Sequence, residues 1–285
     1  KSASTTCIFI KFSSWNISML KLLILASLST LIIMQIFTNR LAVLLLGVLI
    51  FTACTENSGS DSSHSFSHTQ GVGSSANGFL SSTDFTQLII EIDYVKGFKP
   101  SQNALDDLKT FLNARLNKPS GISIILDDEI PSPGNTTFTS QQVYELEKQH
   151  RNTFSMKNTI AAYFLVLDGA YEQENVLGIA YFNTSMALFE EVVQNNTGGF
   201  GQPTATTAES SVLMHEFGHI LGLVNNGTDQ IQDHEDMSHE AHCDVESCLM
   251  YYAIQTTDLM QNLMGGNVPT LDEQCIQDLK ANSGK

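Results

Sequence analysis

Hydrophobic positions change their spacing twice along this chain. Two apolar blocks, residues 19–37 and 41–53, are separated only by the polar tripeptide Thr38-Asn39-Arg40. The next stretch is rich in Ser and Gly and poor in large apolar residues, and from residue 84 apolar positions recur at the spacings of strands and helices. We therefore predict a targeting region over 1–53, a flexible tether over 54–83 and one folded domain over 84–285.

Within the folded domain, strand-like and helix-like stretches alternate. Residues 85–95, 121–126 and 159–167 are short apolar runs bounded by turn-forming residues. Residues 101–116 repeat apolar positions at intervals of three and four, with Ser101 as an N-cap, and a second helix is expected over 139–149. Such alternation predicts a mixed α/β (α+β) domain with a mostly parallel sheet and crossover helices.

The apolar stretch 177–189 has two interpretations. A glycine-led strand here can form a sheet edge to which an extended peptide adds by backbone pairing. It is equally well explained as an ordinary strand with a turn at Asn183. A glycine-containing loop over 194–207 then leads into a helix over about 208–223.

That last helix carries the sequence His215-Glu216-Phe217-Gly218-His219. Residues i and i+4 share one face of a helix, so His215 and His219 can bind one metal ion. Zinc accepts imidazole nitrogen, and its catalytic sites usually have three protein ligands and one open position. Glu216 is then placed to take the proton of a water molecule as the general base.

Charge and composition narrow the classes of binding partner that we expect. The 285-residue chain has 30 acidic and 14 basic residues and a formal net charge of -16. Phosphate binding needs clustered Lys and Arg, so we expect no nucleic-acid partner. His64 and His68 lie in the predicted tether, where we expect them to be solvated.

The segment HEFGHILG, followed 31 residues beyond His219 by Met250 within CLMYY, resembles the metzincin clan of zinc endopeptidases. The resemblance implies a zincin domain with an active-site helix, a smaller C-terminal lobe and a peptide-binding cleft. It also implies that Met250 is the Met-turn methionine and that Tyr252 binds zinc or stabilises the tetrahedral intermediate.

The third zinc ligand departs from the metzincin pattern, because Asn225 occupies the position of the family's His or Asp. After an apparent insertion over 226–241, the sequence His242-Cys243-Asp244-Val245-Glu246-Ser247-Cys248-Leu249-Met250 resembles the HCxxxxCxM of archaemetzincins. There the His is the third ligand, so we predict His242, with His234 and then Asn225 as alternates. His239 is equally well interpreted as a solvated loop residue, an alternative that stays open for each of these three histidines.

In archaemetzincins the cysteines hold a second, structural zinc. Here Cys243, Cys248 and Cys275 are available, but the closing CxxC is replaced by Cys275-Ile276-Gln277-Asp278. Because an exported domain favours oxidation, we expect one disulfide and one free thiol, and only one catalytic zinc ion. The pairing cannot be assigned from the sequence.

The N-terminal region carries an export signal. Met34 is a plausible true start, since the residues after it supply a short positive segment and an apolar segment of signal-peptide length. Ala53-Cys54 at its end resembles the lipobox of bacterial lipoproteins, which implies lipidation of Cys54 and a membrane-anchored protein of the bacterial cell envelope.

These observations predict an exported zinc metalloendopeptidase that acts on peptides or proteins. Two alternatives stay open. One is a catalytically silent surface lipoprotein that keeps zinc for stability, and the other is a zinc aminopeptidase.

Overall fold

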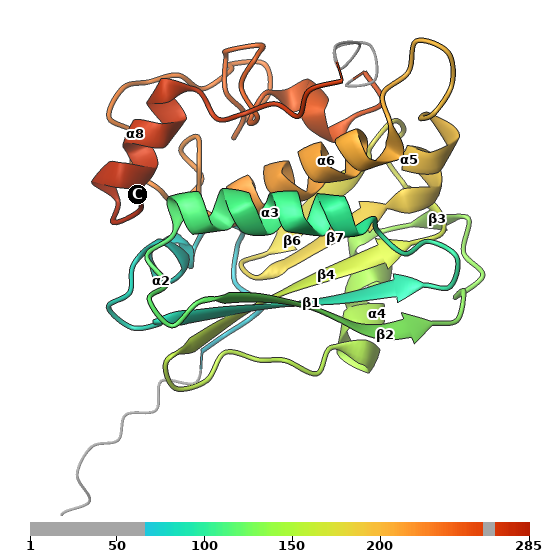
Figure 1. Ribbon diagram of the computed structural model, residues 1–285, viewed down its shortest axis with the longest axis horizontal. Coiled ribbons are helices and arrows are strands. Elements are labelled where there is room, and N and C mark those ends of the chain that lie inside the picture. The colour runs from blue at the N-terminus through green and yellow to red at the C-terminus, as the bar shows by residue number, and fades with distance from the viewer. Residues whose placement is uncertain (1–65, 259–265) are drawn as a thin grey trace, which may run out of the picture. The chain divides into compact units, whose positions relative to one another are not determined.

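The computed structural model describes residues 66–258 and 266–285 (Figure 1). The predicted targeting region, with Met34 and Cys54, lies outside the described residues. No helix within the described part of the chain combines the length and the apolar character needed to span a membrane.

A five-stranded sheet forms the centre of the domain, in the order β2-β1-β4-β7-β6. Its strands are β1 (Gln87–Val95), β2 (Ile122–Ile130), β4 (Thr159–Leu167), β6 (Gly178–Phe182) and β7 (Ser185–Phe189). Neighbouring strands are parallel except for the β6–β7 pair, which is antiparallel. β3 (Thr137–Phe138) and β5 (Ala170–Tyr171) make a small second sheet. The predicted mixed α/β class and mostly parallel sheet are confirmed.

Helices cover both faces of the sheet, which explains why β4 is buried at every position after Thr159. Figure 1 shows α3 (Gln102–Arg115) and α6 (Ala205–Ile220) on one face and α4 (Ser140–His150) on the other. Both predicted helix starts are confirmed. The Ser101 hydroxyl accepts a hydrogen bond from the Ala104 amide, and Thr139 and Gln142 form a capping box.

Residues 177–189 form a hairpin at one edge of the sheet. Asn183 and Thr184 make the turn between β6 and β7, and β6 is the edge strand. The two interpretations of this stretch are therefore compatible, since the predicted turn and a glycine-led edge strand are both present. A smaller difference concerns β2, which continues to Ile130 although a turn was expected from residue 127.

Residues 66–83, which the sequence assigned to a tether ahead of residue 84, are part of the folded structure. Residues 66–83 contain the helix α2 (Ala76–Leu80), whose Phe79 and Leu80 are fully buried. The ring of Phe79 packs edge to face against that of Phe217 in α6, at a centroid distance of 5.6 Å. The tether prediction is wrong here because a few apolar residues are enough to order a segment when the rest of the fold supplies their packing partners.

His68 belongs to this ordered segment and is not a solvated tether residue. Its Nδ1 atom lies 3.2 Å from both Thr184 Oγ1 and Arg151 Nη2. Burial and the neighbouring Arg151 charge lower its pKa to about 4. His64 lies outside the described residues.

The chain after α6 contains little regular structure, in keeping with the predicted smaller C-terminal lobe. Its described helices are the short 3-10 helix η1 (Tyr252–Gln255) and α8 (Glu273–Ala281). This irregular region carries most of the residues that complete the candidate site on α6.

Candidate metal centre and active site

Helix α6 is buried from Thr207 to Ile220, which is unusual for a helix that carries ionisable residues. Thr204 caps its start by accepting a hydrogen bond from the Thr207 amide. One turn apart on one face, His215 and His219 bring their Nε2 atoms within 3.1 Å. The predicted i, i+4 arrangement of His215 and His219 is present.

His242 joins these two side chains. Its ring lies 5.3 Å from that of His215 and 4.9 Å from that of His219, between centroids. One ligand atom from each of the three imidazoles lies within 4.8 Å of the others. The structure therefore brings together the three residues that the sequence placed first.

The two alternates lie elsewhere. Asn225 is exposed, has a positive φ of 61°, and donates to Glu235 Oε2 over 3.3 Å. His234 is buried beside Cys243 and Asp278. Their interpretation as third ligands is not supported by this arrangement.

Backbone carbonyls orient two of the three imidazoles. His215 Nδ1 donates to the Leu249 carbonyl over 2.7 Å, and His242 Nδ1 donates to the Glu240 carbonyl over 2.9 Å. Each bond fixes the tautomer in which Nε2 carries the free lone pair. The Leu249 carbonyl was missed by sequence reasoning, because a backbone group leaves no signature in the side-chain pattern.

Burial keeps these imidazoles neutral, which is the form that binds a metal ion. Desolvation lowers the pKa of His215 to about 3, with a further contribution from His242. Desolvation also lowers the pKa of His219 well below its usual value and lowers that of His242.

Glu216 points from the same helix into a small cavity of about 180 Å³. Its side chain is fully buried, and neither carboxylate oxygen has a hydrogen-bond partner among the described residues. Burial raises the pKa of Glu216 to about 8, and the nearby amide of Ala180, which does not meet the geometry of a hydrogen bond to the carboxylate, opposes this rise. The cavity lining is completed by Val72, Ile179, Ala180, His219, Asn226 and Gln255.

The donor set fits a divalent ion such as zinc. Buried polar atoms are normally paired, yet His242 Nε2 and both Glu216 oxygens have no partner in the described part of the chain. Three neutral imidazoles, two of them with Nε2 held unprotonated, match the ligand chemistry of a catalytic zinc site. Glu216 is left as a base with no competing protein donor.

Met250 supports the helix beneath the three histidines. It is fully buried, and a Cβ atom added to Gly218 would lie 2.2 Å from its Sδ atom. Its backbone carbonyl accepts from the Cys243 amide over 2.8 Å, which ties it to the residue after His242. Gly218 therefore allows the close approach of Met250 to α6.

Tyr252 has a neighbour that the sequence did not predict. Its ring stacks on His239 with a centroid distance of 3.6 Å and an interplanar angle of 3°. Asp236 Oδ2 accepts from His239 Nδ1 over 2.7 Å. His239 is thus packed and hydrogen-bonded, although 40% of its side chain remains exposed.

A second group of side chains of the types that bind metal ions includes Cys243, the residue after His242. The ligand atoms of His234, Cys243, Asp272 and Cys275 lie within 4.8 Å of one another, and Cys248 Sγ is 3.7 Å from Cys275 Sγ. We refer to His234, Cys243, Cys248 and Cys275 as the thiol–imidazole cluster. Its three cysteines are buried and form no disulfide with any described residue, so the expected disulfide is absent from this structure.

Hydrogen bonds among the three thiols favour the thiolate at Cys248 alone, since the hydrogen bond to Cys248 raises the pKa of Cys243, and hydrogen bonds to Cys243 and Cys248 raise that of Cys275. Cys243 and Cys275 lower the pKa of Cys248 through hydrogen bonds to its thiolate. Burial lowers the pKa of His234, but hydrogen bonds to Asp278 and Cys243 outweigh it and raise that pKa. His234 Nε2 lies 2.8 Å from Asp278 Oδ2, so this ring presents Nδ1 to the sulfurs.

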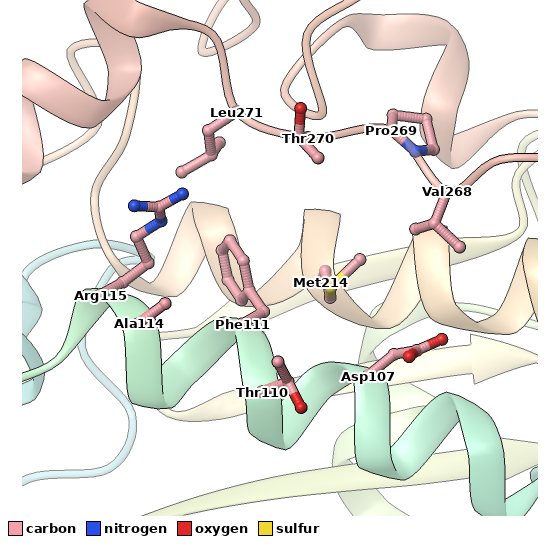
Figure 2. A pocket seen from close by; sticks show the side chains of 10 residues that line it. All are labelled: Asp107, Thr110, Phe111, Ala114, Arg115, Met214, Val268, Pro269, Thr270 and Leu271. Carbon is pink, nitrogen blue, oxygen red and sulfur yellow. The ribbon is translucent and has the colours of Figure 1, made fainter.

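A groove of about 260 Å³ lies between α3, Met214 of α6 and residues 268–271 (Figure 2). It shares no lining residue with the cavity at Glu216, and its surface is mainly apolar. Asp107 and Arg115 of α3 lie at its ends in Figure 2. The groove contains none of the histidines or cysteines described above.

Comparison with known proteins gives distant structural likenesses. No protein-family model matches the chain, and no curated protein matches it. Solved structures that resemble it include an archaemetzincin from Methanopyrus kandleri, with 13% identity over 69% of this chain and 96% of that one, at a TM-score of 0.45. Metalloproteinase-II from Bacteroides fragilis is 15% identical over 68% of this chain and 61% of that one, at a TM-score of 0.36.

Proposed function

We propose that this protein is a zinc-dependent metallopeptidase of metzincin type that cleaves within peptide chains. The observation that supports this function is the convergence of His215, His219 and His242 beside the unpartnered carboxylate of Glu216. A zinc ion in such a site supplies Lewis acidity that activates water and polarises a peptide carbonyl.

The chain's own residues supply the remaining chemistry. His215 and His242 hold their tautomers through the carbonyls of Leu249 and Glu240, so their Nε2 atoms are ready to bind without a proton being lost. Glu216 takes a proton from water at its carboxylate and returns it to the leaving amine. Tyr252 is our candidate for stabilising negative charge on the substrate oxygen.

We also propose that the thiol–imidazole cluster binds a second zinc ion with a structural role. Three thiolates and one imidazole form a complete tetrahedral ligand set for zinc, without an open position. Asp278 stands where a fourth cysteine would close a CxxC pair, and it accepts from His234. Cys243 follows His242, and Cys248 precedes Leu249, so an ion here stabilises both chain segments that complete the catalytic site.

Export and lipid attachment through Cys54 complete the proposal. They rest on the N-terminal sequence pattern, which places an apolar segment directly before Ala53-Cys54. An anchored peptidase of this kind acts on peptides or proteins at the bacterial cell envelope.

Substitution of the proposed base tests the activity. We expect Glu216→Gln to retain its zinc and its thermal stability while peptide cleavage falls by a factor of about 100 or more, since general-base catalysis contributes about 10² to 10⁴. Cleavage of a mixed peptide library is measured by mass spectrometry, and zinc by elemental analysis. Equal cleavage by both proteins would show that the activity does not use Glu216.

The same experiment separates the two alternatives. A silent zinc-binding surface protein would cleave no peptide in either form. An aminopeptidase would shorten long peptides only from their N-termini, whereas an endopeptidase produces internal cuts.

A further inference from the structure

The N-terminal segment 66–75 contributes Val72 to the wall of the cavity at Glu216. At one end, Gln70 and Asn183 of the β6–β7 turn exchange two hydrogen bonds of 3.0 Å. Asn183 Nδ2 also donates to the Ser67 carbonyl and the Ser75 hydroxyl, over 2.9 and 2.8 Å. This end of the segment is therefore fixed to the edge of the sheet.

The other anchor is the turn that follows α6. Gly73 has a φ of 76°, and a Cβ atom added to it would lie 1.6 Å from the Asn226 carbonyl oxygen. A Cβ added to Gly227 would lie 2.4 Å from the Gly73 carbonyl oxygen. The two backbones touch at paired glycines, so only residues without side chains allow this contact.

Val72 lies between these two anchors and lines the cavity that contains Glu216 and His219. Ile179 and Ala180 of the edge strand β6 form a further apolar part of the wall, while Asn226 and Gln255 contribute amide-bearing side chains. Glu216 is the only acidic side chain in the lining. The cavity is thus suited to a small, uncharged side chain next to the reacting groups.

We propose that Val72 is a specificity-determining residue, and that the segment 66–75 is a permanent wall of the substrate site. The cavity of about 180 Å³ is small compared with typical ligand pockets of about 300–1,000 Å³. Val72 therefore limits the size of the substrate side chain that enters beside Glu216. This inference rests on the proposed peptidase function.

The test compares Val72→Ala and Val72→Phe with the wild type on a peptide library. We expect Val72→Ala to shift the side-chain preference at one position flanking the cleaved bond toward larger apolar residues, by roughly tenfold in kcat/KM. Val72→Phe should shift it toward Gly and Ala. Val268→Ala is the matched control, because Val268 lines the separate groove in Figure 2 and should leave the preference unchanged.

Zinc content and melting temperature show whether each variant is folded. If Val72→Phe does not fold, Val72→Ala and the nearly isosteric Val72→Thr decide the question, since the second keeps the size of the wall. An unchanged preference in folded Val72→Ala overturns the inference, even when Glu216→Gln abolishes cleavage as proposed.

Failure of the proposed function would look different. In that case, Glu216→Gln does not reduce whatever cleavage the wild type shows. The role of Val72 is then tested by calorimetry of peptide binding. A peptide series that varies one side chain from Ala through Leu to Phe is titrated into the Glu216→Gln protein with and without Val72→Ala. The same affinity order in both, or no binding, overturns the inference.

Discussion

At the scale of single residues, the site uses backbone carbonyls to orient the histidines that would bind the metal. His242 arrives from a loop whose own residues hold it in place, since its amide donates to the His239 carbonyl and its carbonyl accepts from the Asp236 amide. The third ligand is therefore positioned by the segment 236–242, and not by the helix that carries the other two.

Metal analysis of single variants can separate the two proposed sites. We expect wild-type protein to bind about two zinc ions per chain, and His242→Ala and Cys275→Ser each to bind about one, because each removes a ligand from a different site. His242→Ala should lose activity with little change in melting temperature, whereas Cys275→Ser should lower the melting temperature.

The control for this comparison is His239→Ala, which changes a histidine that lies three residues from His242 but outside both ligand groups. It should retain both ions. Retention of full zinc content by His242→Ala would contradict the assignment of the third ligand. A disulfide between cluster cysteines, shown by a mass lower by two hydrogens, would contradict the second site.

At the scale of secondary structure, the edge strand β6 lies directly on the active-site helix. A Cβ atom added to Gly178 would lie 2.5 Å from Val212 Cγ1 and 3.0 Å from Glu216 Oε1. This glycine was recognised in the sequence only as the start of a strand. Its contact with Glu216 depends on the crossing of two elements that are more than 30 residues apart in the chain.

Gly178→Ala should therefore reduce both activity and stability. The added methyl group pushes β6 away from α6 and disturbs the wall beside Glu216, and overpacking of this kind costs about 1–3 kcal/mol. Urea denaturation measures the loss, and kcat measures the effect on the site. Gly71→Ala is the control, because an added Cβ there meets no atom within 4 Å. Equal loss in both variants would contradict a specific contact.

At the scale of the whole domain, His68 connects the N-terminal segment to Thr184 in the β6–β7 turn and to Arg151 after α4. The folded-state pKa of His68 is about 4, below the ordinary value of 6.5. Between these two values the unfolded chain binds a proton that the folded domain excludes, so stability is complete above about pH 6.5 and falls as the pH drops toward 4.

Replacement of His68 by glutamine should remove this part of the acid sensitivity. We expect the difference in urea midpoint between pH 7.5 and pH 5 to be smaller for His68→Gln than for the wild type, because glutamine does not titrate. His150→Gln provides the matched control, because it replaces a half-buried histidine at the C-terminal end of α4. An unchanged dependence in His68→Gln would show that His68 is not protonated on unfolding.

The spacing of apolar residues in the sequence was enough to predict the main strands and helices of the sheet layer. β4 occupies the predicted residues 159–167, and the helices after Ser101 and Thr139 begin at their predicted caps. Local physical chemistry decides these features, since strand burial, helix amphipathicity and capping each involve residues that are close in sequence. The pair His215 and His219 was predictable for the same reason.

Features that depend on distant contacts required the tertiary structure. Residues 66–83 have the composition of a tether, yet they are ordered because Phe79 meets Phe217 and Gly73 meets Gly227. Likewise, three histidines lie between residue 226, where the predicted insertion starts, and Cys243. The sequence alone could rank them as third zinc ligands only by their resemblance to the archaemetzincin pattern. The fold decides among them, because chain packing sends His242 to α6, His234 to the buried thiols and His239 to Tyr252.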